Sequence, residues 1–180
     1  MASSAPDRPS SGFPLGVASL GIAVTVWSAY LAGWLPDPQP VALVTLFTGG
    51  IGMLVAGIIA FRENAPFGGA FYIAMSTFWA SAGFYFWFFT GGMKDLNADV
   101  AWVFAPWAIF VGIATLGTMR MGSPLITLGS VLFFLELLLV WVGSAFHLGP
   151  IVMQIGAVAG ILSAIVGAVL FYQVMMKEAA

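Results

Sequence analysis

The chain has 180 residues, of which 61% are hydrophobic and only 7% are charged, whereas soluble domains are about 25% charged. Five basic and seven acidic side chains cannot cover a folded chain of this size with a water-compatible surface, so the composition excludes a soluble globular protein. One histidine, no cysteine and a net charge of −2 exclude a thiolate or multi-histidine metal site and a basic surface for nucleic acid.

Six apolar stretches are long enough to cross a bilayer as helices, which takes about 20 residues. They lie at Pro14–Trp34, Val41–Phe61, Gly68–Thr90, Asp99–Met119, Pro124–Phe146 and Ile151–Tyr172. Five of them begin at or near a proline, which the first turn of a helix tolerates because its N–H groups have no intrahelical partner. The predicted fold is therefore an all-α integral membrane protein with six transmembrane helices.

The segments outside these stretches are short. Residues 1–12 contain four serines and two prolines, which predicts a disordered tail. Residues 13–176 form the predicted transmembrane domain, and residues 177–180 form a short C-terminal end. The loops between the helices are too short to hold a second domain.

Basic residues predict the orientation, because cytoplasmic loops collect lysine and arginine. With six spans both termini lie on the same side. Arg8, Arg62, Arg120 and Lys177 fall on that side, and Lys94 falls on the other. We therefore expect a multi-pass protein of the plasma or inner membrane with both termini in the cytoplasm.

Tryptophans lie near the predicted outer boundary, where amphipathic rings settle. These are Trp34, Trp87, Trp102 and Trp141. They indicate an aromatic belt at the outer membrane interface.

In the last span small residues recur at every fourth position, at Gly156, Gly160, Ala164 and Ala168. Such a stripe lets helix backbones approach closely. It indicates either packing within one chain or an interface between subunits, and the sequence leaves both interpretations open.

Glu136, near the centre of the fifth span, is the ionisable residue predicted to lie in mid-membrane. A charge there costs about 2.5–3.5 kcal/mol on insertion scales. Gly129 and Gly143 share its helical face and leave room beside the carboxyl group. Glu136 is therefore either a proton carrier or solute contact, or a neutral acid bonded to a neighbouring hydroxyl or carbonyl group.

No combination of nucleophile, base and orienting residue indicates an enzyme, so we expect no catalytic residues and no cofactor. No lysine lies within a span, which excludes a retinal Schiff base. Arg62 and Arg120 flank the inner ends of helices, where they anchor the topology and are candidates for attracting anions.

Several short motifs follow one another between Phe13 and Tyr172. They are Pro14-Leu15-Gly16, Gly49-Gly50-Ile51, Ala56-Gly57, Phe67-Gly68, Phe78-Trp79, Trp107, Phe110, Thr115-Leu116 and Arg120. In their order and spacing they resemble the acetate uptake transporter family, to which succinate–acetate permeases belong. The resemblance implies six helices and a pore in each protomer, assembly into hexamers, and proton-linked uptake of acetate and sometimes succinate.

The chain departs from this family at the narrow part of the pore. Family members build the constriction from a phenylalanine, a tyrosine and a leucine on the first, third and fifth spans. Those places are held here by Leu20, by Met75 and by either Leu128 or Gly129. These residues, together with Glu136, are the candidates for the substrate pathway, and the loss of two aromatic rings indicates a different or broader solute.

The leading hypothesis is a transporter or channel for acetate and related small carboxylates, in which protonation helps passage. A carboxylate ion is costly to desolvate in an apolar passage, and a protonated acid much less so. The alternative is a passive channel for a small neutral solute such as urea, an amide or ammonia. A third interpretation is a membrane scaffold that transports nothing, with Glu136 as a structural hydrogen bond.

Overall fold

The computed structural model describes residues 10–88 and 98–178, and they are helical apart from short connections. Several predictions lie outside the described residues. These concern most of the tail at 1–12, the end of the third span at Thr90, and the basic residues Arg8 and Lys94.

The six predicted spans all form helices. The elements are α1 (Gly12–Leu31), a second span made of α2 (Gln39–Leu43), the π-helical segment η1 (Val44–Gly52) and α3 (Met53–Arg62), then α4 (Pro66–Phe88), α5 (Ala98–Thr118), the short 3₁₀ segment η3 (Met119–Met121), α6 (Pro124–Ala145) and α7 (Pro150–Glu178). Within the described ranges, five spans are long and apolar enough to cross a membrane by length and hydropathy. The remaining one, α4, has 23 residues. Its tyrosine, tryptophan, serine and glycine residues lower its hydropathy.

Two boundaries differ from the expected ones. Helix α1 begins at Gly12, two residues before Pro14. Helix α7 continues past Tyr172 to Glu178. Good helix formers such as Met175, Met176 and Lys177 follow Tyr172 with no glycine or proline to end the helix.

The second span contains a π-helical segment where a regular helix was expected. Its glycines lie directly against α4, since a Cβ atom added to Gly49 would come within 2.7 Å of the Trp79 Cβ atom. The hydroxyl of Thr45 donates to the Val41 carbonyl oxygen at 2.7 Å, which serves a backbone group at the point where the regular pattern changes. The π-helical segment therefore lies where the second span approaches α4 closely, and hydropathy along the sequence contains no information about this contact.

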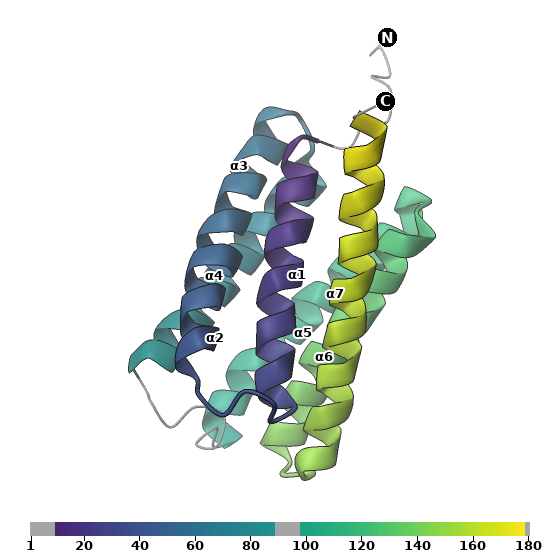
Figure 1. Cartoon of the computed structure of the whole chain (residues 1–180). Coiled ribbons are helices and arrows are strands. Elements are labelled where there is room, and N and C mark those ends of the chain that lie inside the picture. The colour runs from purple at the N-terminus through teal and green to yellow at the C-terminus, as the bar shows by residue number, and fades with distance from the viewer. Residues whose placement is uncertain (1–9, 89–97, 179–180) are drawn as a thin grey trace.

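Successive spans run antiparallel, and α1 lies in the middle of the bundle (Figure 1). Helix α1 packs on α7, η1 and α3, while α6 packs on both α5 and α7. The beginning of α1 and the end of α7 lie at the same end of the bundle (Figure 1). We call this the terminal end. The predicted outer tryptophans lie at the opposite end, where Trp34 and Trp87 are exposed.

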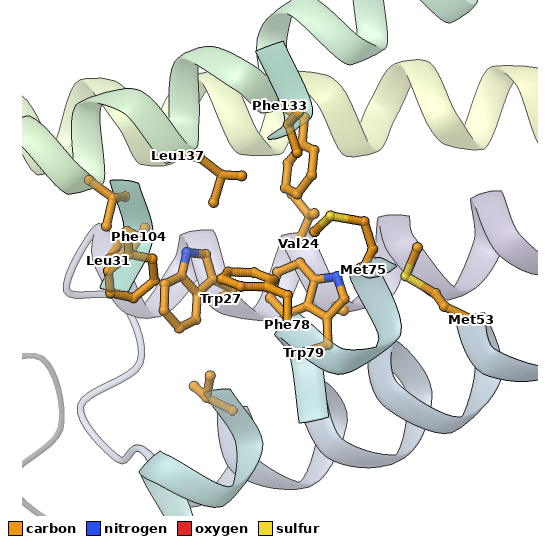
Figure 2. Close-up of a cluster of buried hydrophobic side chains, with 14 of the residues drawn as sticks. Val24, Trp27, Leu31, Met53, Met75, Phe78, Trp79, Phe104, Phe133 and Leu137 are labelled. Atoms are coloured by element: carbon orange, nitrogen blue, oxygen red, sulfur yellow. The ribbon is translucent and has the colours of Figure 1, made fainter. Parts of the chain in front are cut away.

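Large aromatic side chains fill the core. Trp27 of α1 meets Phe78 and Trp79 of α4 edge-on, with ring centroids 6.4 and 6.0 Å apart. Phe104 of α5 closes the same cluster, 5.8 Å from Trp27 (Figure 2). The outward faces of the helices carry exposed isoleucine, leucine and valine side chains, as expected for surfaces in contact with lipid.

Candidate functional site

A cavity of about 70 Å³ lies in the half of the bundle nearer the terminal end. It is lined by one side of α1, α4, α5, α6 and α7. The lining residues are Val17, Leu20, Gly21, Phe71, Val111, Ala114, Ile126, Gly129, Ser130, Phe133, Ser163, Gly167 and Leu170. None of these residues carries a charge, so the cavity is an apolar space with two hydroxyl groups.

The structure separates the four aligned pathway candidates. Leu20 and Gly129 both line the cavity. Leu128 is 48% exposed and does not line the cavity, so it lies on a different face of α6 from Gly129. Met75 is fully buried and does not line the cavity. It belongs to the core directly beside it.

Beyond the cavity, three buried side chains close the bundle toward the tryptophan-rich end. Figure 2 shows Phe133 of α6 pointing toward Val24 of α1 and Met75 of α4, and each is 2% exposed or less. We call these three residues the apolar plug. The Trp79 ring packs against the apolar plug, stacked on the Phe133 ring at a centroid distance of 6.3 Å.

Sequence reasoning assigned Phe133 no role in the pathway, although a signal was available. Phe133 follows Gly129 by four residues, so both lie on one face of α6. Phe133 is therefore an aromatic residue on the same side of α6 as Gly129, next to buried Met75 of α4.

Hydroxyl groups beside the cavity give their protons to helix carbonyl oxygens. Ser163 of α7 donates to the Gly129 carbonyl oxygen at 2.9 Å, and Ser130 donates to the Ile126 carbonyl oxygen at 2.9 Å. Thr115 of α5 donates to the Val111 carbonyl oxygen at 2.8 Å and lies 3.2 Å from that of Ser130. The Ser163 bond joins α7 to α6, and the Thr115 contact with the Ser130 carbonyl oxygen joins α5 to α6.

Glu136 lies one helical turn beyond Phe133 and is fully buried. Ser28 of α1 donates to its Oε1 atom at 2.6 Å. Gly160 of α7 leaves the space that the carboxyl group occupies, because a Cβ atom there would collide with Glu136 Oε1 and Ser28 Oγ. Among the described residues the Oε2 atom has no hydrogen-bond partner. One carboxyl oxygen is therefore held between three helices, and the other is buried without a hydrogen-bond partner in the described part of the chain.

This arrangement also decides part of the small-residue stripe on α7. Gly160 contacts Glu136 and Ser28, and a Cβ atom on Gly156 would lie 3.3 Å from Leu139 of α6. These two glycines therefore pack within one chain. Ala168, at the far end of the stripe, is exposed.

Arg62 ends α3 and Arg120 lies within η3, and both are exposed at the terminal end of the bundle. The nearby N-terminus of α1 already holds a carboxylate, since Ser11 donates from its backbone N–H to Glu63 Oε2 at 2.6 Å and from its hydroxyl to Oε1. Glu63 therefore occupies the first turn of α1.

The Pro14-Leu15-Gly16 motif has a packing role. Gly16 lies against the ring of Tyr72, where a Cβ atom would overlap the ring atoms. The Tyr72 hydroxyl donates to the Phe13 carbonyl oxygen at 3.5 Å. This contact holds the beginning of α1 on α4 next to cavity-lining Phe71.

Over the described ranges no group of three histidine, aspartate or glutamate side chains is arranged to hold a metal ion.

A family model described as the GPR1/FUN34/yaaH family matches residues 3–180. No curated protein matches the chain. A solved structure described as that of the bacterial acetate channel SatP is similar, with a TM-score of 0.86, 17% identity, and coverage of 96% of this chain and 95% of that chain. At this identity the likeness concerns the fold.

Proposed function

The chain belongs to the GPR1/FUN34/yaaH family, and from this premise we propose that it carries acetate and related small carboxylates across the membrane. Membership confirms the resemblance to acetate uptake transporters, and the helices make the chain a multi-pass membrane protein. The observation that carries the proposal is the cavity that ends at the apolar plug. A solved structure of the same fold is described as an acetate channel, and the cavity of this chain, about 70 Å³, is lined by uncharged residues.

The geometry supports a pathway along α1, α4 and α6. Leu20 and Gly129 bound the cavity, and Phe133 with Val24 and Met75 closes it. Carboxylate ions are costly to move into such an apolar space, whereas a protonated acid is not. Proton-linked passage is therefore part of the proposal.

The orientation and the inner mouth belong to the same proposal. With both termini in the cytoplasm, Arg62 and Arg120 face the cytoplasm and raise the local concentration of anions. We expect a fluorescent protein fused after Ala180 to fluoresce in cells, and alkaline phosphatase fused there to stay inactive. Active phosphatase at this position would reverse the orientation. Assembly into hexamers, implied by the family, is tested by the mass of the detergent-solubilised protein.

Uptake of labelled acetate into proteoliposomes, with an inward proton gradient, tests the function. We expect saturable uptake above that of protein-free vesicles, reduced by other short carboxylates. Uptake no faster than in protein-free vesicles, with the protein shown to be folded, would contradict the proposal.

A passive channel for a neutral solute is the second candidate, because no lining residue of the cavity is charged. Urea and acetamide flux in the same vesicles separates the two functions. Linear flux of these solutes that carboxylates leave unchanged favours the neutral-solute channel, whereas saturation and competition by carboxylates favour acetate uptake.

We propose that Glu136 contacts the solute after it passes the plug, through the Oε2 atom that has no partner in the described part of the chain. Glu136→Gln keeps an oxygen for the Ser28 hydroxyl and replaces Oε2 by an amide group. We expect acetate uptake to fall about tenfold, which corresponds to a barrier higher by ~1.4 kcal/mol. The measurement is the initial rate of uptake between acid and neutral pH.

Two other results assign Glu136 differently. Loss of the pH dependence in Glu136→Gln would make Glu136 the proton carrier. An unchanged rate and pH dependence would leave it as a structural hydrogen bond between α1, α6 and α7, and the transport proposal would still stand.

A further inference from the structure

We propose that Trp27 and Trp79 form a solute-binding site on the far side of the apolar plug, where their indole N–H groups donate hydrogen bonds to the carboxyl or carbonyl oxygen atoms of a small solute. This inference rests on the proposed function, because it places the site on the pathway proposed for acetate. It adds two specificity-determining residues that the proposed function does not use.

The register of three helices places polar side chains directly beyond the plug. Helices α1, α4 and α6 all begin at the terminal end, so a residue three or four positions later lies one turn nearer the tryptophan-rich end. Each plug residue is followed at this distance by a buried side chain with a polar atom: Val24 by Trp27, Met75 by Trp79, and Phe133 by Glu136. We call Trp27, Trp79 and Glu136 the polar layer.

All three residues of the polar layer hold a polar atom that lacks a partner. Within the described residues, the Nε1 atoms of Trp27 and Trp79 and the Oε2 atom of Glu136 are buried and take part in no hydrogen bond. Trp27 is 1% exposed and Trp79 is 0% exposed, so bulk water does not serve their N–H groups. Because buried polar groups are nearly always paired, three unpaired atoms at one level indicate a ligand with complementary hydrogen-bonding groups.

The two indole rings lie against the plug and against each other. Their centroids are 6.0 Å apart in an edge-on contact, and the Trp79 ring is stacked on Phe133. Figure 2 shows the Trp27 nitrogen turned toward Leu137 of α6 and the Trp79 nitrogen turned toward Met75 of the plug. Both N–H groups therefore point into the bundle and not toward lipid.

The contact between α1 and α6 brings the carboxyl group of Glu136 to the same level. Ser28, the residue after Trp27, donates to Glu136 Oε1 at 2.6 Å. This bond occupies one carboxyl oxygen and leaves Oε2 for the solute. The polar layer thus offers two indole donors and one carboxyl oxygen within one turn of the bundle.

An indole N–H group selects oxygen acceptors, because tryptophan has a donor and no acceptor. A carboxylate, a carboxylic acid and an amide all present oxygen lone pairs to such a donor. The indole carries no charge, and a pathway requires binding that is weak enough to be released. Phe133 lies between the cavity and the polar layer, so its ring has to move before a solute reaches the indoles.

Removing the Trp27 donor while keeping its rings tests the site. β-(3-Benzothienyl)alanine incorporated at position 27 keeps both rings and has sulfur in place of the N–H group, and Trp27→Phe removes the donor by ordinary mutagenesis. The measurement is the initial rate of labelled acetate uptake in proteoliposomes over a range of acetate concentrations. We expect the sulfur analogue to raise the concentration for half-maximal uptake about three- to tenfold, the factor that one hydrogen bond usually contributes.

Trp141→Phe is the matched control. The Trp141 Nε1 atom is also buried without a partner in the described part of the chain, but its ring lies 5.5 Å from that of Trp102, which is exposed. We expect uptake by Trp141→Phe to stay within about twofold of the unsubstituted chain. Size-exclusion chromatography and thermal unfolding establish that each variant folds.

Nuclear magnetic resonance measures binding without transport. The protein is labelled with ¹⁵N-tryptophan in detergent micelles, and Trp27→Phe, Trp79→Phe and Trp141→Phe assign three of the seven indole signals. A hydrogen bond to oxygen deshields the N–H proton, so we expect the Trp27 and Trp79 signals to move downfield and saturate as sodium acetate is added. The Trp141 signal should stay in place, and sodium chloride at equal concentration should move none of the three.

The results that overturn the inference differ from those that overturn the function. An unchanged half-maximal concentration in the folded sulfur analogue would show that Trp27 only packs in the core, and acetate transport would still stand. An equal rise in Trp141→Phe would also overturn the site, because the effect would then follow from the loss of any indole. Uptake by the unsubstituted chain no faster than in protein-free vesicles would overturn the proposed function, and saturating shifts of the two indole signals would still support the site.

Discussion

Replacing Gly129 by leucine should block acetate uptake. The new side chain starts 3.3 Å from Val166 Cγ1 and extends into a cavity of about 70 Å³, which it fills. We expect uptake to fall tenfold or more, since a barrier raised by only ~1.4 kcal/mol already has that effect. The measurement is the initial rate of labelled acetate uptake in proteoliposomes.

The neighbouring residue provides the control. Leu128 is 48% exposed and does not line the cavity, so Leu128→Ala should leave uptake within about twofold of the unsubstituted chain, as surface substitutions change free energies by about ±0.5 kcal/mol or less. If Leu128→Ala abolished uptake while Gly129→Leu retained it, the pathway would run along the other face of α6.

Replacing Phe133 by alanine should open the apolar plug. The Phe133 ring meets Val24 and Met75 across the bundle and is 2% exposed. Without it, water and larger solutes can pass from the cavity toward Glu136, so we expect faster uptake and weaker discrimination against longer carboxylates. Because a buried aromatic ring is lost, stability should also fall by about 3–5 kcal/mol. Uptake of acetate and butyrate, together with thermal unfolding, tests both effects.

Phe134→Ala is the matched control for this variant. Phe134 is half-buried on the next face of α6, and its ring comes within 3.0 Å of a Cβ atom added to Gly112 of α5. Its loss should lower stability without opening the plug. If both variants changed selectivity alike, the effect would come from loosened packing and not from the plug.

Both predictions depend on the direction in which side chains point, which hydropathy does not contain. The choice between Leu128 and Gly129 illustrates this. Adjacent residues on a helix point about 100° apart. A shift of one residue in the alignment therefore moves the aligned position from the cavity side of the helix to the lipid side. Only the packing of α6 against α7 and α5 placed Gly129 on the cavity side.

Phe133 and the π-helical segment η1 were beyond sequence reasoning for a related reason. From the sequence, a phenylalanine in a transmembrane stretch can face either lipid or the core. The positions of the neighbouring helices decide between the two. The π-helical segment in η1 goes with the contact between Gly49 and Trp79 of α4, a pair 30 residues apart in the chain. Local propensity carries no information about such a contact.

Glu136 was predicted in part from the sequence. Its burial was predicted correctly, because an acid in the centre of an apolar stretch has no route to water. Its partner was not, since any of several hydroxyl groups in other spans was a candidate. The structure selects Ser28, 108 residues earlier, because Gly160 of α7 leaves room for the Glu136 and Ser28 side chains to meet.

The amino-acid sequence by itself determined that this is a membrane protein and that it belongs to the acetate uptake transporter family. It also determined where five of the six spans start, near Pro14, Pro40, Pro66, Pro124 and Pro150. These properties follow from composition, from the length of apolar stretches and from short motifs, all of which are local along the chain. The tertiary structure alone decided which faces of the helices meet. The cavity, the apolar plug and the Glu136–Ser28 contact exist because side chains from distant spans pack together, and packing is a property of the whole bundle.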